Sequence, residues 1–276
     1  MRVLVTGNQG RIGRYVQAQL EAENHIVVGF DRAAGDDIRQ PAALRAAAQG
    51  CDAIIHMAAM LADPKDDPND VMHVNLQGTW HVLTTAEALD IRRVVCFSSV
   101  NALGIFIGES LPDYLPINEE HPCRPGRPYA LSKFLGEEMC RLFTRRTNIT
   151  TICLRPPWVC FPENYARVRQ RWAEKPESEW SPIWEYGAFC DVRDVAAAAV
   201  LGLTCADPGH ARLLLCADDV MTSGRTSREL AAQIHPDVAW RGREEYESEP
   251  FRALVDNSQA KAVLGWQPRY SWQAQE

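Results

Sequence analysis

The feature that most constrains this chain is a glycine-rich segment at residues 6–13, TGNQGRIG, close to its start. It directly follows an apolar run at 3–5 and precedes a segment, 11–23, whose apolar residues recur at helical spacing. Strand, glycine turn and helix in this order form a cradle for a pyrophosphate, because the start of the helix offers free N–H groups and a positive dipole end. Three glycines would serve the tight turn, the close approach of backbone to phosphate, and the packing of helix on strand: Gly7, Gly10 and Gly13.

An acidic residue follows the second expected strand, at 25–30. Asp31 lies 18 residues beyond Gly13, where a carboxylate accepts hydrogen bonds from the ribose hydroxyls of adenosine and repels a 2′-phosphate. This favours NAD over NADP. The neighbouring Arg32 leaves NADP open, because a guanidinium can hold a phosphate. The alternative interpretation of Asp31 is a plain turn residue.

Short apolar runs alternate with helix-period segments through the first half of the chain. An alternation of this kind predicts an α/β fold, a Rossmann-type doubly wound parallel sheet with helices on both faces. A loop rich in proline and glycine interrupts it at 104–128. The expected strands are 3–5, 25–30, 53–56, 93–97 and 150–154, and the expected helices are 11–23, 41–49, 70–89 and 129–146.

The pattern changes after Arg155, where tryptophans become frequent. We expect a helix at 194–203, a strand at 213–215, a capping box at 226–229 and a polar surface loop at 175–182. The predicted organisation is therefore a dinucleotide-binding core at 1–155 and a small C-terminal substrate-binding region at 156–276. The second region is expected to interleave with the last strands and helices of the core.

Composition narrows the function class. A net charge of −7 argues against a nucleic-acid partner but not against a small anion held by one local arginine. The nine cysteines include no C-x-x-C pair, so buried free thiols in a reducing compartment are favoured over disulfides or a metal site. We find neither a signal-peptide pattern nor an apolar stretch long enough for a membrane span, and expect a cytoplasmic protein without membrane contact.

A second group of residues has the side chains needed for proton transfer. Tyr129 and Lys133 are four residues apart, which places them one turn apart on one helix face. A free tyrosine has a pKa of about 10, and a nearby ammonium favours the tyrosinate that can remove a hydroxyl proton. Ser98 and Ser99 end the fourth expected strand, where a hydroxyl can stabilise charge on the reacting oxygen. A Tyr-x-x-x-Lys pair alone is common on solvated helix faces, and serines alone are common at strand ends. The prediction of a catalytic group therefore rests on their joint order after the phosphate loop.

Taken together, these segments resemble the extended short-chain dehydrogenases/reductases, the NAD-dependent epimerase/dehydratase family. The resemblance extends over nearly the whole chain. Further matching segments are Asp37-Ile38, residues 56–59 (HMAA), residues 75–79 (NLQGT), Arg155-Pro156, residues 191–196 (DVRDVA) and residues 258–268.

The resemblance implies roles for individual residues. The catalytic group would be Ser99, Tyr129 and Lys133, whereas His56 would be structural. A homodimer built on the central helix and the Tyr-Lys helix is also implied. The implied NAD-binding residues are Gly7, Gln9, Gly10, Arg11, Ile12, Gly13, Asp31, Asp37, Ile38, Met57, Ala58, Ala59, Asn75, Ser98, Tyr129, Lys133 and Pro156.

Within the family, the short region after Arg155 is similar to that of uronate dehydrogenases, which oxidise free hexuronic acids. Arg167 resembles their carboxylate-binding arginine, although it is one of three alternating arginines. This chain departs from their pattern at Leu61, Asn101 and Trp158, which makes the pocket more apolar than a hexuronate requires. The implied substrate-binding residues are Ser99, Asn101, Trp158 and Arg167.

We therefore expect an NAD-dependent dehydrogenase that acts on a sugar or sugar acid. The alternative is an epimerase, which uses the same Tyr/Lys chemistry but returns the hydride and tends to retain its cofactor. A dehydratase would need an extra carboxylate after the serine pair, where residues 100–102 read VNA. A non-catalytic dinucleotide sensor is disfavoured, because such proteins typically lose the tyrosine or the lysine.

Overall fold

The central element is one parallel six-stranded sheet. The computed structural model describes residues 1–61, 65–180 and 185–274. The strand order β2-β1-β3-β4-β6-β9 places β2 and β3 on opposite sides of β1, so the chain changes direction there, as in the predicted doubly wound fold. The strands are β1 (Arg2–Thr6), β2 (Ile26–Phe30), β3 (Ala53–His56), β4 (Arg93–Phe97), β6 (Thr150–Arg155) and β9 (His210–Leu214).

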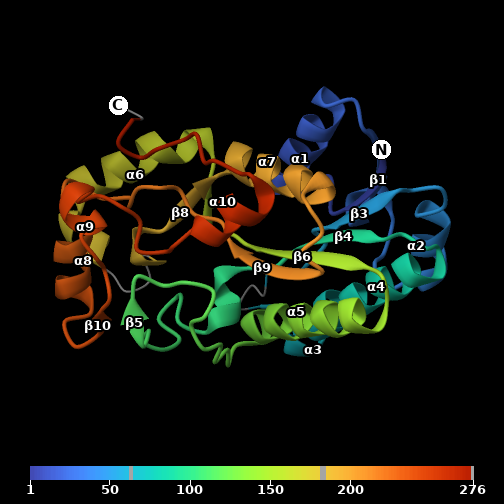
Figure 1. Cartoon of the computed structure of the whole chain (residues 1–276), viewed down its shortest axis with the longest axis horizontal. Helices are drawn as coiled ribbons and strands as arrows, with labels where there is room; N and C mark the ends of the chain where they lie inside the picture. The colour runs from blue at the N-terminus through green and yellow to red at the C-terminus, as the bar shows by residue number, and fades with distance from the viewer. Residues whose placement is uncertain (62–64, 181–184, 275–276) are drawn as a thin grey trace.

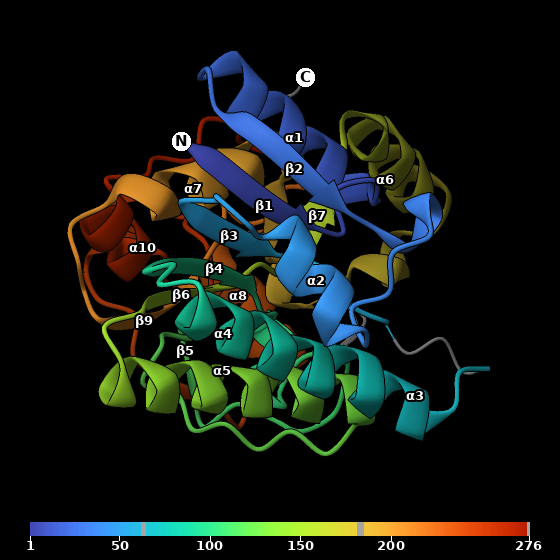
Figure 2. The same ribbon diagram turned by 90° about the vertical axis from the view of Figure 1, so that its right-hand side faces the viewer.

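Helices cover both faces of this sheet (Figures 1 and 2). On one face lie α1 (Arg11–Ala22), α7 (Val192–Thr204) and α10 (Ser258–Leu264). On the other lie α2 (Pro41–Ala47), α4 (Gly78–Ala88) and α5 (Pro128–Arg146), with α3 (Pro68–Met72) leading into α4. The β9 strand comes from the second half of the chain, so the core sheet is completed after residue 155.

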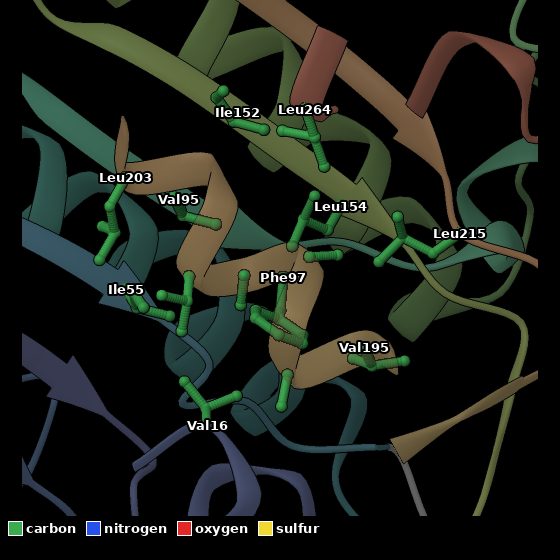
Figure 3. Close-up of a cluster of buried hydrophobic side chains, with 14 of the residues drawn as sticks. Val16, Ile55, Val95, Phe97, Ile152, Leu154, Val195, Leu203, Leu215 and Leu264 are labelled. Atoms are coloured by element: carbon green, nitrogen blue, oxygen red, sulfur yellow. The ribbon is translucent and has the colours of Figure 1, made fainter. Parts of the chain in front are cut away.

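The alternation of side chains along each strand explains the two cores. In β1, Val3 and Val5 join the cluster under α1 and α7, whereas Leu4 joins the cluster on the other face. Figure 3 shows the first cluster, in which Val16 of α1, Val195 of α7 and Leu264 of α10 come together over the strands. Both faces are buried, which is why these strands read as continuous apolar runs.

A smaller region lies beyond the end of the sheet, at the left of Figure 1. Its last tryptophan, Trp272, donates its indole N–H to the Thr222 carbonyl at 2.7 Å. Trp266 instead packs in the core of the main sheet and donates to the Asp194 carbonyl at 3.0 Å. The elements of the smaller region are two two-stranded pairs, β7 (Trp158–Cys160) with β8 (Phe189–Asp191) and β5 (Tyr114–Leu115) with β10 (Ala239–Trp240), and the helices α6 (Pro162–Glu174), α8 (Ser227–Ile234) and α9 (Glu245–Ser248).

Four local predictions can be compared with the structure. The helix expected at 70–89 begins at Pro68 and contains a π-helical turn at His73–Gln77, and the loop at 104–128 contributes β5. The predicted capping box is present, with Thr226 and Glu229 capping each other. The prediction of a polar surface loop at 175–182 is wrong in part, because Glu179 is buried and accepts hydrogen bonds from Thr222 and Ser223. Residues 181 and 182 lie outside the described residues.

All nine cysteines are free, and seven of them are buried. Among the residues that the structure describes, no group of three or more His, Cys, Asp or Glu side chains could hold a metal ion. Within the same ranges, every helix is too short or too polar to cross a membrane.

Glu119 makes a pH-dependent contribution to stability. Its carboxylate accepts a hydrogen bond from the Leu214 N–H at 2.9 Å, and burial raises its pKa to about 7. The unfolded chain therefore loses this proton near pH 4.5 and the folded chain near pH 7, so folding becomes less favourable as pH rises through this window.

We expect Glu119→Gln to stabilise the protein at pH 8 by up to about 3 kcal/mol and to add nothing at pH 4. Urea unfolding at the two pH values measures the difference. The exposed neighbour Glu120 provides the control, because Glu120→Gln should be neutral at both. An equal effect of Glu119→Gln at pH 4 and pH 8 would contradict this assignment.

Candidate active site

The glycine-rich loop between β1 and α1 depends on its glycines. Gly7 has a φ of +78°, and a Cβ there would lie 2.8 Å from the Ala58 nitrogen. A Cβ on Gly13 would lie 2.1 Å from the Gly7 carbonyl oxygen, so helix and loop could not pack as they do. A Cβ on Gly10 would meet only the Gly7 carbonyl, at 3.2 Å. A side chain at Gly7 or Gly13 would therefore clash with neighbouring backbone. At Gly10 the absence of a side chain leaves the loop backbone accessible from the cavity.

Carboxylates gather where β2 ends. Asp31 accepts hydrogen bonds from the backbone N–H groups of Gln9 and Ala33, at 2.9 and 2.8 Å, which ties β2 to the glycine loop. Asp37 pairs with Arg39 at 2.7 Å, and that hydrogen-bonded guanidinium lowers the pKa of Asp37. Both acids line a cavity of about 430 Å³ with Gly7, Gln9, Gly10, Arg32, Asp36, Ile38, Met57, Ala58 and Ala59. The carboxylates suit the ribose hydroxyls of adenosine, while Arg32 in the same lining is the group that could hold a 2′-phosphate.

A larger cavity, of about 730 Å³, continues from the first one. The two share the lining residues Gly7, Gly10, Met57 and Ala59, so they form one groove along the carboxyl ends of the strands. The larger cavity brings together Ser99, Tyr129 and Lys133 with the start of α1. It is also lined by Arg11, Ile12, Gly13, Ser98, Asn101, Pro156 and Trp158.

Lys133 is held by backbone. Its ammonium donates to the Phe97 carbonyl at 2.7 Å and lies 5.6 Å from the centroid of the Tyr129 ring. Burial lowers the pKa of Lys133 to about 8. At neutral pH the group is therefore mainly protonated, and it places a positive charge beside Tyr129 at the floor of the cavity.

The two serines that end β4 have different partners. Ser98 donates its hydroxyl to Glu137 at 2.5 Å, and Glu137 is in turn held by two hydrogen bonds from Arg155, at 2.8 and 2.6 Å. Ser99 accepts a hydrogen bond from the Asn101 N–H at 3.2 Å and caps the turn that follows. Ser98 is thus committed to a buried network, whereas the hydroxyl proton of Ser99 is available to a ligand in the cavity.

Asn75 does not line either cavity. It is buried in the π-helical turn, where its amide accepts from the Met60 N–H at 2.7 Å and donates to the Met60 carbonyl at 2.9 Å. It also donates to the Ser132 hydroxyl at 3.0 Å, beside Lys133 on α5. Asn75 therefore joins the loop after β3 to the Tyr-Lys helix instead of lining the cofactor groove.

The sequence comparison agrees with this geometry. The family model for the NAD dependent epimerase/dehydratase family matches residues 3–213. The chain belongs to this family. A putative UDP-glucose 4-epimerase of Methanocaldococcus jannaschii is 29% identical over 297 residues, covering 96% of this chain and 93% of that protein. A uronate dehydrogenase of Pseudomonas syringae pv. tomato is 26% identical over 166 residues, covering 56% of this chain and 58% of that protein.

Solved structures show the same fold. A short-chain dehydrogenase/reductase superfamily protein from Agrobacterium tumefaciens, solved with bound NAD, superposes with a TM-score of 0.72 at 24% identity, over 100% of this chain and 94% of that one. The chain is thus an NAD-dependent family member with a Rossmann-type sheet, the fold of that short-chain dehydrogenase/reductase superfamily protein.

Not every residue implied by the family lies in the groove of this member. Arg167 is exposed on α6 and does not line the large cavity, because Tyr165, Val168 and Trp172 take the buried face of that helix. His56 is buried between the hydroxyls of Thr6 and Thr79, at 2.8 and 3.2 Å, and burial lowers its pKa to about 4. His56 therefore stays neutral at physiological pH and lies beneath the groove.

Several cavity residues were not singled out from the sequence. Arg127 precedes α5, Ile107 lies in the loop after β4, and Phe161 precedes α6. Arg127 had one usable signal, since it lies two residues before Tyr129 at a helix start. Ile107 had none, because the loop that carries it has no regular periodicity.

Proposed function

We propose that this protein is an NAD-dependent dehydrogenase that oxidises a hydroxyl group of a sugar or sugar acid. The observation that supports it is the convergence of Ser99, Tyr129 and Lys133 on one cavity that continues into the dinucleotide groove. NAD supplies the hydride acceptor when it is bound. The groove from Asp31 to the start of α1 would hold its adenosine and pyrophosphate, and Lys133 would hold the nicotinamide ribose.

The protein's own residues would remove one proton, that of the substrate hydroxyl. The Tyr129 hydroxyl oxygen, as tyrosinate, takes the proton of the substrate hydroxyl while the Lys133 ammonium stabilises its negative charge. The Ser99 hydroxyl donates a hydrogen bond to the reacting oxygen and keeps it oriented. Asn75 and the Phe97 carbonyl hold the helix and the lysine in position.

The second candidate is a sugar or nucleotide-sugar epimerase. The full-length likeness to a putative UDP-glucose 4-epimerase favours it, whereas the uronate dehydrogenase match covers about half of the chain. The larger cavity favours the dehydrogenase, because its described lining includes only three cationic side chains, Arg11, Arg127 and Lys133. Arg and Lys side chains are the usual partners of phosphate groups, and a nucleoside diphosphate adds a second diphosphate to that of the cofactor.

The deciding experiment mixes the purified protein with NAD or NADP and a panel of hexuronic acids, aldoses and sugar nucleotides, and follows the absorbance of reduced cofactor. Growth of NADH with a free sugar or sugar acid supports the dehydrogenase. A redox-neutral change of a sugar nucleotide, with NAD that copurifies and does not exchange, would replace it with the epimerase.

We also propose a homodimer formed through the outer faces of α4 and α5. Trp80 of α4 and Leu142 of α5 are 48% and 46% exposed, large apolar side chains on neighbouring helices. Light scattering should then give twice the chain mass of 30.9 kDa. A monomer mass at micromolar concentration would contradict the proposal.

A further inference from the structure

The described lining of the large cavity includes three cationic side chains, and two of them are already engaged. Lys133 donates to the Phe97 carbonyl at 2.7 Å. Arg11 pairs with Glu163 at 3.2 Å and lies 3.9 Å from the centroid of the Phe161 ring, next to the glycine loop. The guanidinium of Arg127 has no hydrogen bond or ion pair within the described residues.

The backbone around Arg127 is fixed although its side chain is free. Its N–H donates to the Glu109 carboxylate at 2.7 Å, and the Gly126 N–H donates to the same oxygen. Because Glu109 already satisfies these amides, the start of α5 does not present them to another anion. The guanidinium of Arg127 is a cationic side chain without an internal partner at this end of the cavity, two residues before Tyr129, so it is free to bind an anion.

The other substrate-side lining is mostly apolar. Leu61, Ile107 and Trp158 line the cavity with Pro157 and Val159. Ile107 has a φ of +53°, a conformation that a β-branched side chain rarely adopts. The segment before it is held in place, because Phe106 is fully buried against Tyr186 and the Tyr186 hydroxyl donates to the Ile105 carbonyl at 2.5 Å.

We propose that the substrate is a small hydroxy acid with a single carboxylate, bound by Arg127, and with a hydroxyl-poor side that packs on Leu61, Ile107 and Trp158. This inference rests on the proposed dehydrogenase function and narrows its substrate class to acids. One planar guanidinium matches one carboxylate in a bidentate fork. Sugar hydroxyls pressed on the apolar side would lose water without gaining partners, which disfavours a fully hydroxylated ring there.

The first test compares Arg127→Gln with Arg167→Gln, since both remove an exposed guanidinium but only Arg127 lines the cavity. With a hexuronic acid as substrate, we expect Arg127→Gln to lower kcat/KM by about 10- to 100-fold and Arg167→Gln to leave it unchanged. The neutral hexose of the same ring configuration should react equally poorly with all three proteins. A loss in Arg167→Gln with none in Arg127→Gln would overturn the proposal.

The second test concerns the apolar side. Asn tolerates the left-handed backbone, so Ile107→Asn adds a polar group without adding strain. We expect the wild type to prefer a deoxyhexuronic acid over the parent hexuronic acid by at least about 10-fold, and Ile107→Asn to reduce that preference. A wild-type preference for the fully hydroxylated acid would overturn this part of the proposal.

A binding measurement separates failure of this inference from failure of the proposed function. The hexuronic and deoxyhexuronic acids are titrated calorimetrically into protein saturated with NADH. If the protein forms no NADH but binds the acid, and Arg127→Gln abolishes this binding, the carboxylate site is supported and the dehydrogenase function is refuted. If the protein forms NADH and Arg127→Gln does not change the rate, the dehydrogenase function is supported and the carboxylate site at Arg127 is refuted. Unchanged affinity for NAD in Arg127→Gln shows that this variant is folded.

Discussion

Tyr129→Phe is expected to lower kcat by about 10²- to 10⁴-fold while the Kd for NAD stays within about threefold of the wild-type value. The substitution removes one oxygen from the cavity and keeps the ring that lies 5.6 Å from the Lys133 ammonium. Without that oxygen the chain offers no tyrosinate to take the substrate proton. The glycine loop and Asp31, which would hold most of the dinucleotide, are untouched.

The matched control is Tyr114→Phe. Tyr114 donates its hydroxyl to Asn118 at 2.8 Å, in β5 and away from the cavity lining, so its loss should leave kcat within about twofold. Full turnover in Tyr129→Phe would remove Tyr129 from the chemistry. The result bears on the dehydrogenase and the epimerase alike, because both need this base.

The parts of the site that could be predicted from the sequence are those set by local spacing. The order strand, glycine turn, helix fixes the phosphate loop, and a separation of four residues brings Tyr129 and Lys133 to one helix face. The position of Ser99 follows from the end of a strand. In each case the relevant neighbours are within one element or at a junction between two elements.

The parts that could not be predicted depend on contacts between distant segments. Glu109 holds the two backbone N–H groups just before α5 from 17 and 18 residues away, and nothing local marks it for that role. Ile107 is brought to the cavity by Tyr186, whose hydroxyl contacts a carbonyl 81 residues earlier. Arg167 is a different case, since the apolar spacing of Tyr165, Val168 and Trp172 already placed it off the buried face of α6.

The buried pair of Glu137 and Arg155 supports the floor of the site. Both side chains are at most 1% exposed, and Glu137 also accepts the Ser98 hydroxyl at the cavity edge. We expect Glu137→Ala to lower the free energy of unfolding by about 3–5 kcal/mol, because it leaves the Arg155 charge buried without its partner. The control is Glu138→Ala, one residue along, which loses partly exposed ion pairs with Arg141 and Arg212 and should cost about 1 kcal/mol or less.

Urea unfolding of the two alanine variants measures this difference, and the double variant Glu137→Leu with Arg155→Met identifies its cause. Removing both charges together leaves no unpaired ion, so the double variant should regain most of the stability that Glu137→Ala loses. If it does, the pair is needed less for stability than for holding Ser98 and the end of β4 beside Lys133. A double variant as unstable as Glu137→Ala would instead mean that packing around these side chains, and not the uncompensated charge, accounts for the loss.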